Sequence, residues 1–169
     1  MSEVFTIDNL IQPASVHCGC QVGSRKRLFQ AIAKDLVDPA LAEDEEAIDQ
    51  IFDALVERER LGSTALGAGV AIPHCRTDRQ EIFGAFYTLA QPVDFEAPDN
   101  LPVDLVFVLL VPRDEKKAHI LALQRLAGLF SNPSNLALLR QANSDEALHA
   151  LLLEIDAGLT SNDADRKFA

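Results

Sequence analysis

One segment near the middle of the chain concentrates groups suited to holding and accepting a phosphoryl group. It runs from Arg58 to His74 and reads RERLGSTALGAGVAIPH. Its glycines permit tight turns in which backbone N–H groups approach an anion, and Ser63 and Thr64 add hydroxyl donors. The guanidinium of Arg58 can form two parallel hydrogen bonds to an oxyanion. A neutral imidazole is a nucleophile, so His74 is the candidate acceptor in this set.

Two nucleotide-binding motifs are incomplete in the same segment. Gly62 and Gly67 have the spacing of a P-loop, but Ala68 and Gly69 stand where that motif requires Lys followed by Ser or Thr. The third glycine of a dinucleotide-binding loop is also missing. Structural roles are also open on residue type alone: a surface histidine, hydroxyls that cap or turn the chain, and an arginine that binds the last carbonyls of its helix.

Hydrophobic periodicity predicts the elements that must position this segment. Apolar residues recur at helical spacing before the segment and again after about residue 115, whereas other stretches are apolar or β-branched in the manner of strands. The expected helices cover about residues 25–37, 43–60, 115–130, a stretch beginning at Asn132-Pro133, and Ser144 to about residue 156. The expected strands cover about residues 70–72, 82–90 and 103–111.

The stretch from Val103 to Val111 is almost continuously apolar, which is typical of a central strand covered on both faces. Helices before, between and after the strands then indicate an α/β fold. We expect a single-domain three-layer α/β/α sandwich with a mixed β-sheet. The domain should extend over residues 4–156, and the polar residues 157–169 should form a flexible tail.

Composition narrows the kinds of partner. The 169 residues carry a formal net charge of −11, from 26 acidic and 15 basic side chains, which disfavours binding to nucleic acid or anionic lipid. Cys18, Cys20 and Cys75 are too sparse for a disulfide framework, and no second Cys/His cluster completes a metal site with His17. The apolar runs are too short to span a membrane and no export signal is visible, so we expect a cytoplasmic protein.

The run LGSTALGAGVAIPH resembles the active-site signature of the fructose/mannitol class of enzyme IIA in the bacterial phosphotransferase system. The resemblance implies that His74 is phosphorylated and that Arg58 stabilises the phosphate. It also implies a second active-site histidine after an apolar strand that ends in Val-Pro, and His119 fits that position. The phosphoryl donor of such a protein is a phosphohistidine on another protein, so the resemblance predicts no cofactor and no catalytic metal.

The likeness covers about residues 4–156 and is similar in detail to the nitrogen-related branch of that class. The residues that carry this finer likeness are Ser24 to Arg27, Phe95 to Asn100 with Pro102 to Leu105, and Ala142 to Glu146. Ala68 departs from the pattern, since related proteins often have Asn there, and one possible donor is thereby absent.

The resemblance implies a regulatory phosphocarrier. A phosphohistidine carrier protein would phosphorylate it, and its phosphorylation state would control protein targets such as sensor kinases or potassium transport proteins. Two alternatives stay open: a sugar-specific IIA component that delivers phosphate to a fructose or mannitol permease, and a non-catalytic interaction module.

Overall fold

The computed structural model describes the backbone of residues 5–167 and side chains as far as residue 159. Its helices are α1 (Arg25–Leu36), α2 (Glu45–Arg60), α3 (Lys117–Phe130), α4 (Pro133–Gln141) and α5 (Asp145–Lys167). Its strands are β1 (Val16–Cys20), β2 (Ala65–Gly67), β3 (Val70–Ala71), β4 (His74–Thr77), β5 (Phe83–Val93) and β6 (Val103–Pro112). Short 3-10 helices occupy Ile7–Asn9, Pro13–Ser15 and Pro39–Leu41.

The strands form one mixed sheet in the order β1-β5-β6-β3-β2, with β4 also paired to β6. β5 runs antiparallel to β6, whereas β3 and β4 both run parallel to it. These two short strands follow one another along the same edge of β6, with Val70 opposite Leu105 and His74 opposite Leu109. The central strand β6 therefore fixes the position of His74.

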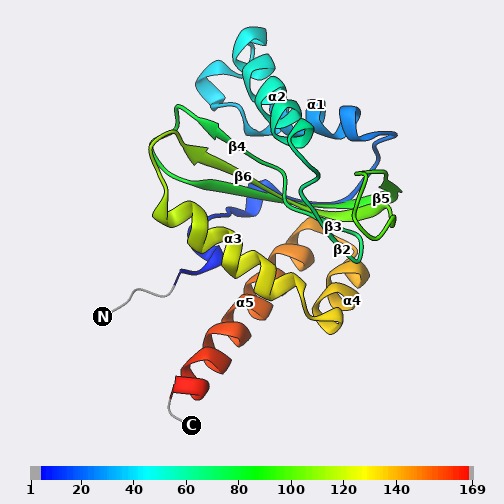
Figure 1. Ribbon diagram of the computed structural model, residues 1–169, viewed down its shortest axis with the longest axis vertical. Helices are drawn as coiled ribbons and strands as arrows, with labels where there is room; N and C mark the ends of the chain where they lie inside the picture. Colours follow the sequence, from blue (N-terminus) through cyan, green and yellow to red (C-terminus); the bar gives the residue numbers. More distant parts are fainter. Residues whose placement is uncertain (1–4, 168–169) are drawn as a thin grey trace.

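Helices cover both faces of the sheet: α1 and α2 lie on one side, and α3, α4 and α5 on the other (Figure 1). Side chains of β6 alternate between two hydrophobic cores, as the period of two residues in a strand requires. The core beneath α3, α4 and α5 receives Leu105, Phe107, Leu109 and Val111. The core beneath α1 and α2 receives Val106, Val108 and Leu110. The expected three-layer α/β/α sandwich with a mixed sheet is confirmed.

Side-chain caps fix where three helices begin, because each satisfies backbone N–H groups that the helix itself cannot pair. Ser24 accepts from the N–H of Arg27 at 3.1 Å, and Asn132 accepts from the N–H of Ser134 at 2.9 Å. Asp44 accepts from two N–H groups and starts α2 at Glu45, two residues later than about 43. α2 ends at Arg60, so Arg58 lies in its last turn.

Two features differ from the sequence-based expectation. Strands β1, β2 and β4 were not expected, because they are short and β1, VHCGC, lacks a β-branched alternation. The helix expected to end near residue 156 continues as α5 to Lys167, so residues 157–167 are helical rather than a loose tail. Extending an existing helix adds a hydrogen bond for each residue fixed, which explains how a polar segment continues it. The domain limits 4–156 stay a prediction.

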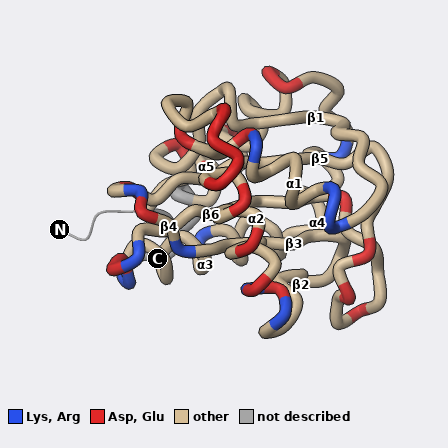
Figure 2. The backbone as a smooth tube through the Cα atoms, turned by 90° about the horizontal axis from the view of Figure 1, so that it is seen from above, with Lys and Arg blue, Asp and Glu red and all other residues tan. Residues whose placement is uncertain are grey.

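Acidic and basic residues are interspersed over the chain, and α2 carries more acidic than basic ones (Figure 2). Over the described part of the chain, no helix combines the length and the apolar character needed to cross a membrane.

Candidate functional site

Arg58 reaches from the last turn of α2 to the imidazole of His74. Its Nε donates to Nε2 of His74 at 3.2 Å, and its Nη1 donates to the carbonyl of Gly62 at 2.9 Å. The second bond holds the guanidinium against the turn that follows the helix. Arg58 is therefore a cation fixed directly at one nitrogen of the candidate nucleophile.

The other ring nitrogen of His74 identifies its tautomer. Nδ1 lies 2.8 Å from the carbonyl oxygen of Ile72, and since a carbonyl only accepts, Nδ1 carries the proton. Nε2 then holds the free lone pair, which agrees with the hydrogen bond that it accepts from Arg58. Assigned in this way from its partners, the ring presents Nε2 as the nucleophilic atom.

The surroundings of His74 keep the ring neutral. Burial lowers its pKa below the ordinary value of 6.5, and the positive charges of Arg58 and Arg76 lower the pKa further. The hydrogen bond to Ile72 acts in the opposite direction without reversing the shift. A neutral ring is the form that attacks an electrophile, so the site favours nucleophilic chemistry at neutral pH.

His119 lies on the first turn of α3 and meets His74 edge to face, with ring centroids 5.2 Å apart. Its Nδ1 is 3.4 Å from Nη2 of Arg76, and because a guanidinium only donates, the ring proton resides on Nε2. Within the described residues, this Nε2 is a buried side-chain nitrogen without a hydrogen-bond partner. Burial of such a donor is unfavourable until an acceptor arrives, and a phosphoryl oxygen on His74 would supply one.

Arg76 is a site residue that the sequence analysis missed. It stands two residues after His74 on β4, and residues two apart on a strand share a face, which is the signal that would have found it. Its Nη1 also donates to the carbonyls of Pro112, Arg113 and Glu115 at 3.0, 2.9 and 2.8 Å. Arg76 thus holds the loop that leads into α3 and orients His119.

Ser63 and Thr64 lie in the turn between α2 and β2, but their hydroxyls have other acceptors. The Ser63 hydroxyl donates to the carbonyl of Phe95 at 2.7 Å. Thr64 is buried, and its hydroxyl donates to the carboxylate of Glu59. Each hydroxyl has a single proton, so neither can donate to a phosphate while these bonds persist. The structure brings Arg58, His74 and His119 together and gives Ser63 and Thr64 structural contacts.

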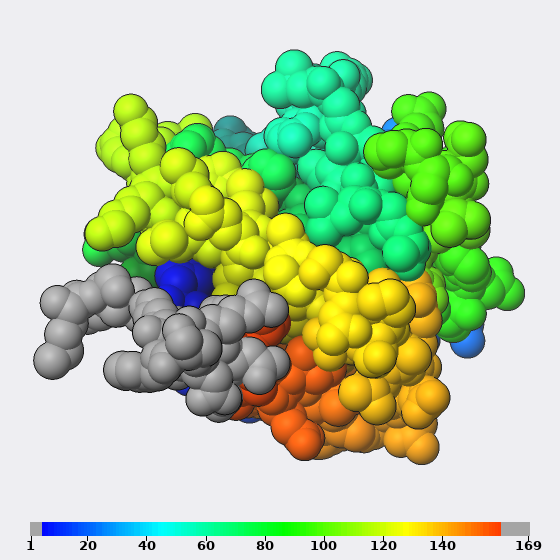
Figure 3. Space-filling view, turned by 60° about the horizontal axis from the view of Figure 1, so that its bottom comes forward, coloured from blue at the N-terminus to red at the C-terminus, as the bar shows by residue number. Residues whose placement is uncertain are grey.

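Exposed apolar side chains stand beside both ends of the site. Leu61, just after α2, is 85% exposed, and Ile120, the neighbour of His119, is 56% exposed. Ile120 is exposed although it follows the helical spacing of apolar residues in α3. Figure 3 shows the α2–β2 segment beside α3 on one face of the molecule. This face offers apolar contacts around the histidines, as a protein-docking surface requires.

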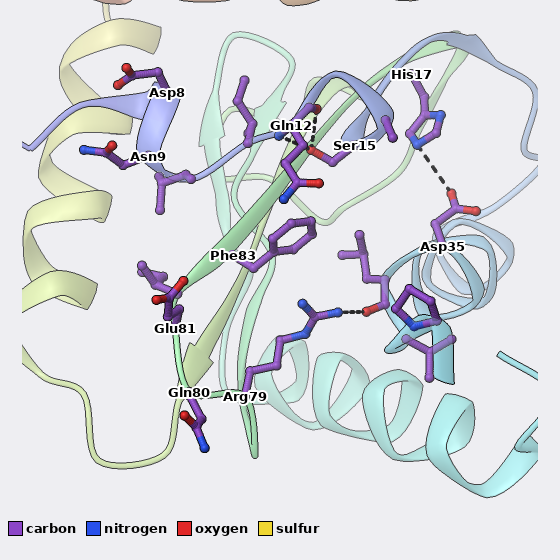
Figure 4. A pocket seen from close by; sticks show the side chains of 17 residues that line it. Asp8, Asn9, Gln12, Ser15, His17, Asp35, Arg79, Gln80, Glu81 and Phe83 are labelled. Carbon is purple, nitrogen blue, oxygen red and sulfur yellow. Dashed lines mark hydrogen bonds and ion pairs between the residues drawn. The ribbon is translucent and has the colours of Figure 1, made fainter. Parts of the chain in front are cut away.

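A hollow of about 750 Å³ lies elsewhere, between the N-terminal segment, the end of α1 and the start of β5 (Figure 4). His17 lies there, 3.9 Å from Asp35 and stacked on Tyr87. Arg79 donates to the carbonyl of Leu36. The residues that line this hollow do not include Arg58, His74 or His119. Among the described residues, no group of His, Cys, Asp and Glu is arranged to hold a metal ion.

Comparison with known proteins agrees with this arrangement. The family model described as "Phosphoenolpyruvate-dependent sugar phosphotransferase system, EIIA 2" matches residues 9–155. The chain belongs to this family. The family is a component of the phosphotransferase system that accepts phosphate on histidine, which confirms the expected class of activity.

Relatives place the chain in the regulatory part of the family. A nitrogen regulatory protein of Pseudomonas aeruginosa is 38% identical over 156 residues, which is 92% of this chain and 99% of the relative. One from Bradyrhizobium diazoefficiens is 37% identical over 147 residues, or 86% and 94% of the two chains. The crystal structure of IIA-Ntr from Neisseria meningitidis superposes with a TM-score of 0.78 at 39% identity, covering 86% of this chain and 98% of that one. The expected resemblance to the nitrogen-related branch is confirmed.

Proposed function

We propose that Nε2 of His74 accepts the phosphoryl group from a phosphohistidine carrier protein. The observation that carries the proposal is the three-residue arrangement: a neutral imidazole with a free lone pair, Arg58 at 3.2 Å from that nitrogen, and His119 with an unpaired Nε2–H beside it. His74 supplies the nucleophile, and Arg58 and His119 supply donors for the oxygens of the phosphoryl group.

The chemical step forms one bond and breaks one. The lone pair on Nε2 of His74 attacks the phosphorus, the donor's phosphorus–nitrogen bond breaks, and that electron pair returns to the donor imidazole. His74 keeps its proton on Nδ1, where the carbonyl of Ile72 stabilises the positive charge that develops on the ring. The donor already carries an activated phosphoryl group, so this step requires no nucleotide and no metal.

Arg58 and His119 both donate hydrogen bonds to the negatively charged oxygens of the transferred phosphoryl group. Arg58 moves from Nε2, which becomes phosphorylated, to the oxygens of the phosphoryl group. His119 donates its Nε2–H to one of these oxygens, which satisfies the buried nitrogen. Donors aimed in advance at transition-state charge are the largest contribution in reactions of this type. Ser63 and Thr64 join them only if their hydroxyls leave Phe95 and Glu59.

The regulatory role follows from the charge that the phosphoryl group adds. A phosphorylated side chain brings about −1.5 to −2 charges near pH 7. Placed between the exposed Leu61 and Ile120, this charge changes which partner surfaces bind there. We propose a cytoplasmic protein whose targets, such as sensor kinases or potassium transport proteins, distinguish the two states. Its named relatives are nitrogen regulatory proteins, so delivery of phosphate to a sugar permease is the less supported alternative.

A labelling experiment tests the proposal. The full chain is incubated with a radiolabelled, phosphorylated histidine phosphocarrier protein, and transferred label is followed before and after mild acid treatment. We expect one acid-labile phosphoryl group per chain, lost in His74→Ala and retained in His17→Ala, which removes a histidine outside the site. Label on His74→Ala at the wild-type level, or label that survives acid, would contradict the assignment. A folded chain that takes no label would support the non-catalytic module instead.

A further inference from the structure

Glu59 is a buried carboxylate directly after Arg58, and the phosphoryl-transfer step described above gives it no part. Its side chain is 4% exposed, although acidic side chains are rarely buried without partners. One oxygen accepts the hydroxyl of Thr64, and the other accepts the backbone N–H of Thr64 at 3.2 Å. Arg25, from α1, lies 3.7 Å from the second oxygen. All of these partners are donors, so both carboxylate oxygens are satisfied as acceptors.

Thr64 connects this carboxylate to the short segment between β3 and β4 that leads into His74. Its carbonyl accepts the backbone N–H of Ile72 at 3.1 Å. The carbonyl of Ile72 in turn accepts the proton on Nδ1 of His74 at 2.8 Å. Two residues, Thr64 and Ile72, therefore separate the buried carboxylate from the nucleophile, and each successive contact is a hydrogen bond. The last of these bonds determines which ring nitrogen has the lone pair.

The same turn is held from a second side. The carbonyl of Phe95 accepts from the Ser63 hydroxyl at 2.7 Å and from Arg25 at 3.4 Å. Ser63 Oγ also accepts the N–H of Ala65 at 3.1 Å. Arg25 thus touches both anchors of the turn, the carboxylate of Glu59 and the carbonyl of Phe95. The turn is fixed by α1 and by the β5–β6 loop in addition to its own helix.

We propose that Glu59 is a positioning residue that sets the tautomer of His74 through Thr64 and Ile72. It acts without contacting the phosphoryl group. The carboxylate accepts from Thr64, the Thr64 carbonyl accepts from the N–H of Ile72, and the Ile72 carbonyl accepts the proton on Nδ1 of His74. This leaves Nε2 of His74 as the reactive atom facing Arg58. The proposal rests on His74 as the phosphoryl acceptor.

Conservative variants separate this role from simple stabilisation. In Glu59→Gln the amide presents a single acceptor oxygen, so one of the two Thr64 donors loses its partner. Thr64→Val keeps the shape of the buried side chain and removes the hydroxyl, whereas Thr64→Ser keeps the hydroxyl. Glu57→Gln is the matched control, because Glu57 lies on the same helix, is exposed and pairs only with the exposed Arg60 among described contacts.

Two readouts are needed. Nitrogen-15 chemical shifts of the His74 ring report the tautomer in the full, unphosphorylated chain at mildly alkaline pH. Steady-state transfer from a phosphorylated histidine phosphocarrier protein gives kcat and KM separately. The tautomer measurement does not depend on phosphorylation, so it tests the role of Glu59 even if the chain accepts no phosphoryl group, which would contradict the proposed function instead.

We expect wild type, Glu57→Gln and Thr64→Ser to hold the Nδ1–H form. In Glu59→Gln and Thr64→Val the Nε2–H form should become substantial, with kcat about 10-fold lower and KM unchanged, the lower end of the loss seen when groups orienting a ligand histidine are removed at metal sites. If Glu59→Gln does not fold, the two Thr64 variants decide. Folded Glu59→Gln or Thr64→Val with an unchanged tautomer and kcat would overturn the proposal, as would an Nε2–H ring in wild type.

Discussion

Arg76 Nη2 and His119 Nδ1 face each other at 3.4 Å, and this contact determines that His119 presents a proton rather than a lone pair to His74. The same arginine donates to three carbonyls in the loop before α3, so the orientation of the ring and the position of its helix depend on one side chain. The neighbouring rings of His74 and His119 are thereby kept in different tautomers.

Arg76→Met should slow phosphoryl transfer about 10-fold, because His119 loses the partner that fixes its tautomer and the loop loses three hydrogen bonds. The rate of labelling by a phosphorylated carrier protein measures this effect. Arg113→Met is the control, since Arg113 is 63% exposed and forms an exposed ion pair with Asp78, a kind of contact that contributes little. Equal labelling rates in the two variants would show that Arg76 has no part in phosphoryl transfer.

Arg58→Ala should slow transfer by on the order of 100-fold while the fold persists, because a preorganised donor aimed at the transferred oxygens is lost. Single-turnover labelling gives the rate, and thermal unfolding checks the fold. Arg60→Ala removes a neighbouring arginine that is 71% exposed and should transfer at nearly the wild-type rate. Loss of rate in both variants alike would indicate a general effect of positive charge on docking.

Acid should destabilise the chain in part through His74. Its pKa is lowered below 6.5 in the folded state, chiefly by burial, so below about pH 6.5 the unfolded chain binds a proton at this residue that the folded chain does not yet bind. The stability present above the unfolded pKa is therefore lost as the pH falls toward the folded value. His74→Gln should lose less free energy of unfolding between about pH 7 and about pH 5 than wild type. Equal losses in urea titrations would contradict this shift.

Gly69→Ala should reduce the free energy of unfolding by about 1–3 kcal/mol. The φ of Gly69 is +82°, and an added Cβ would meet the Arg140 guanidinium and lie 2.8 Å from Oδ1 of Asp104. The control is Gly128→Ala, because a Cβ there meets nothing within 4 Å and alanine favours the helix by about 0.5–1 kcal/mol. Urea unfolding of both variants measures the difference, and a stable Gly69→Ala would contradict the strained-turn account.

The fold was predictable where hydrophobic pattern and burial agree. The almost continuous apolar run of β6 and the helical spacing of Leu28, Phe29 and Ile32 on α1 each correspond to buried residues. Strands β2 and β4 were not predictable, because they are defined by their pairing with β3 and β6 rather than by their own residues. Ile120 shows the limit of periodicity, since it follows the helical spacing and yet lies beside His119 at the surface.

The site was predictable as far as motif and resemblance extend, to Arg58, His74 and His119. Arg76 contacts the carbonyl of Pro112, and Glu59 lies 3.7 Å from Arg25, so both have partners that are distant in sequence and appear only in the folded chain. The hydroxyls of Ser63 and Thr64 have the right chemistry for phosphate, but sequence cannot show that Phe95 and Glu59 already accept their protons.

The atom that is phosphorylated tests the central claim most directly. After incubation with a phosphorylated histidine phosphocarrier protein, phosphorus-31 spectra and nitrogen-15 ring shifts of the labelled chain identify the phosphorylated nitrogen. The account predicts one phosphohistidine, at His74, with phosphorus on Nε2, because Nδ1 is occupied by its proton and the Ile72 carbonyl. Phosphorus on Nδ1 of His74, on His119, or on a serine or threonine oxygen would contradict it.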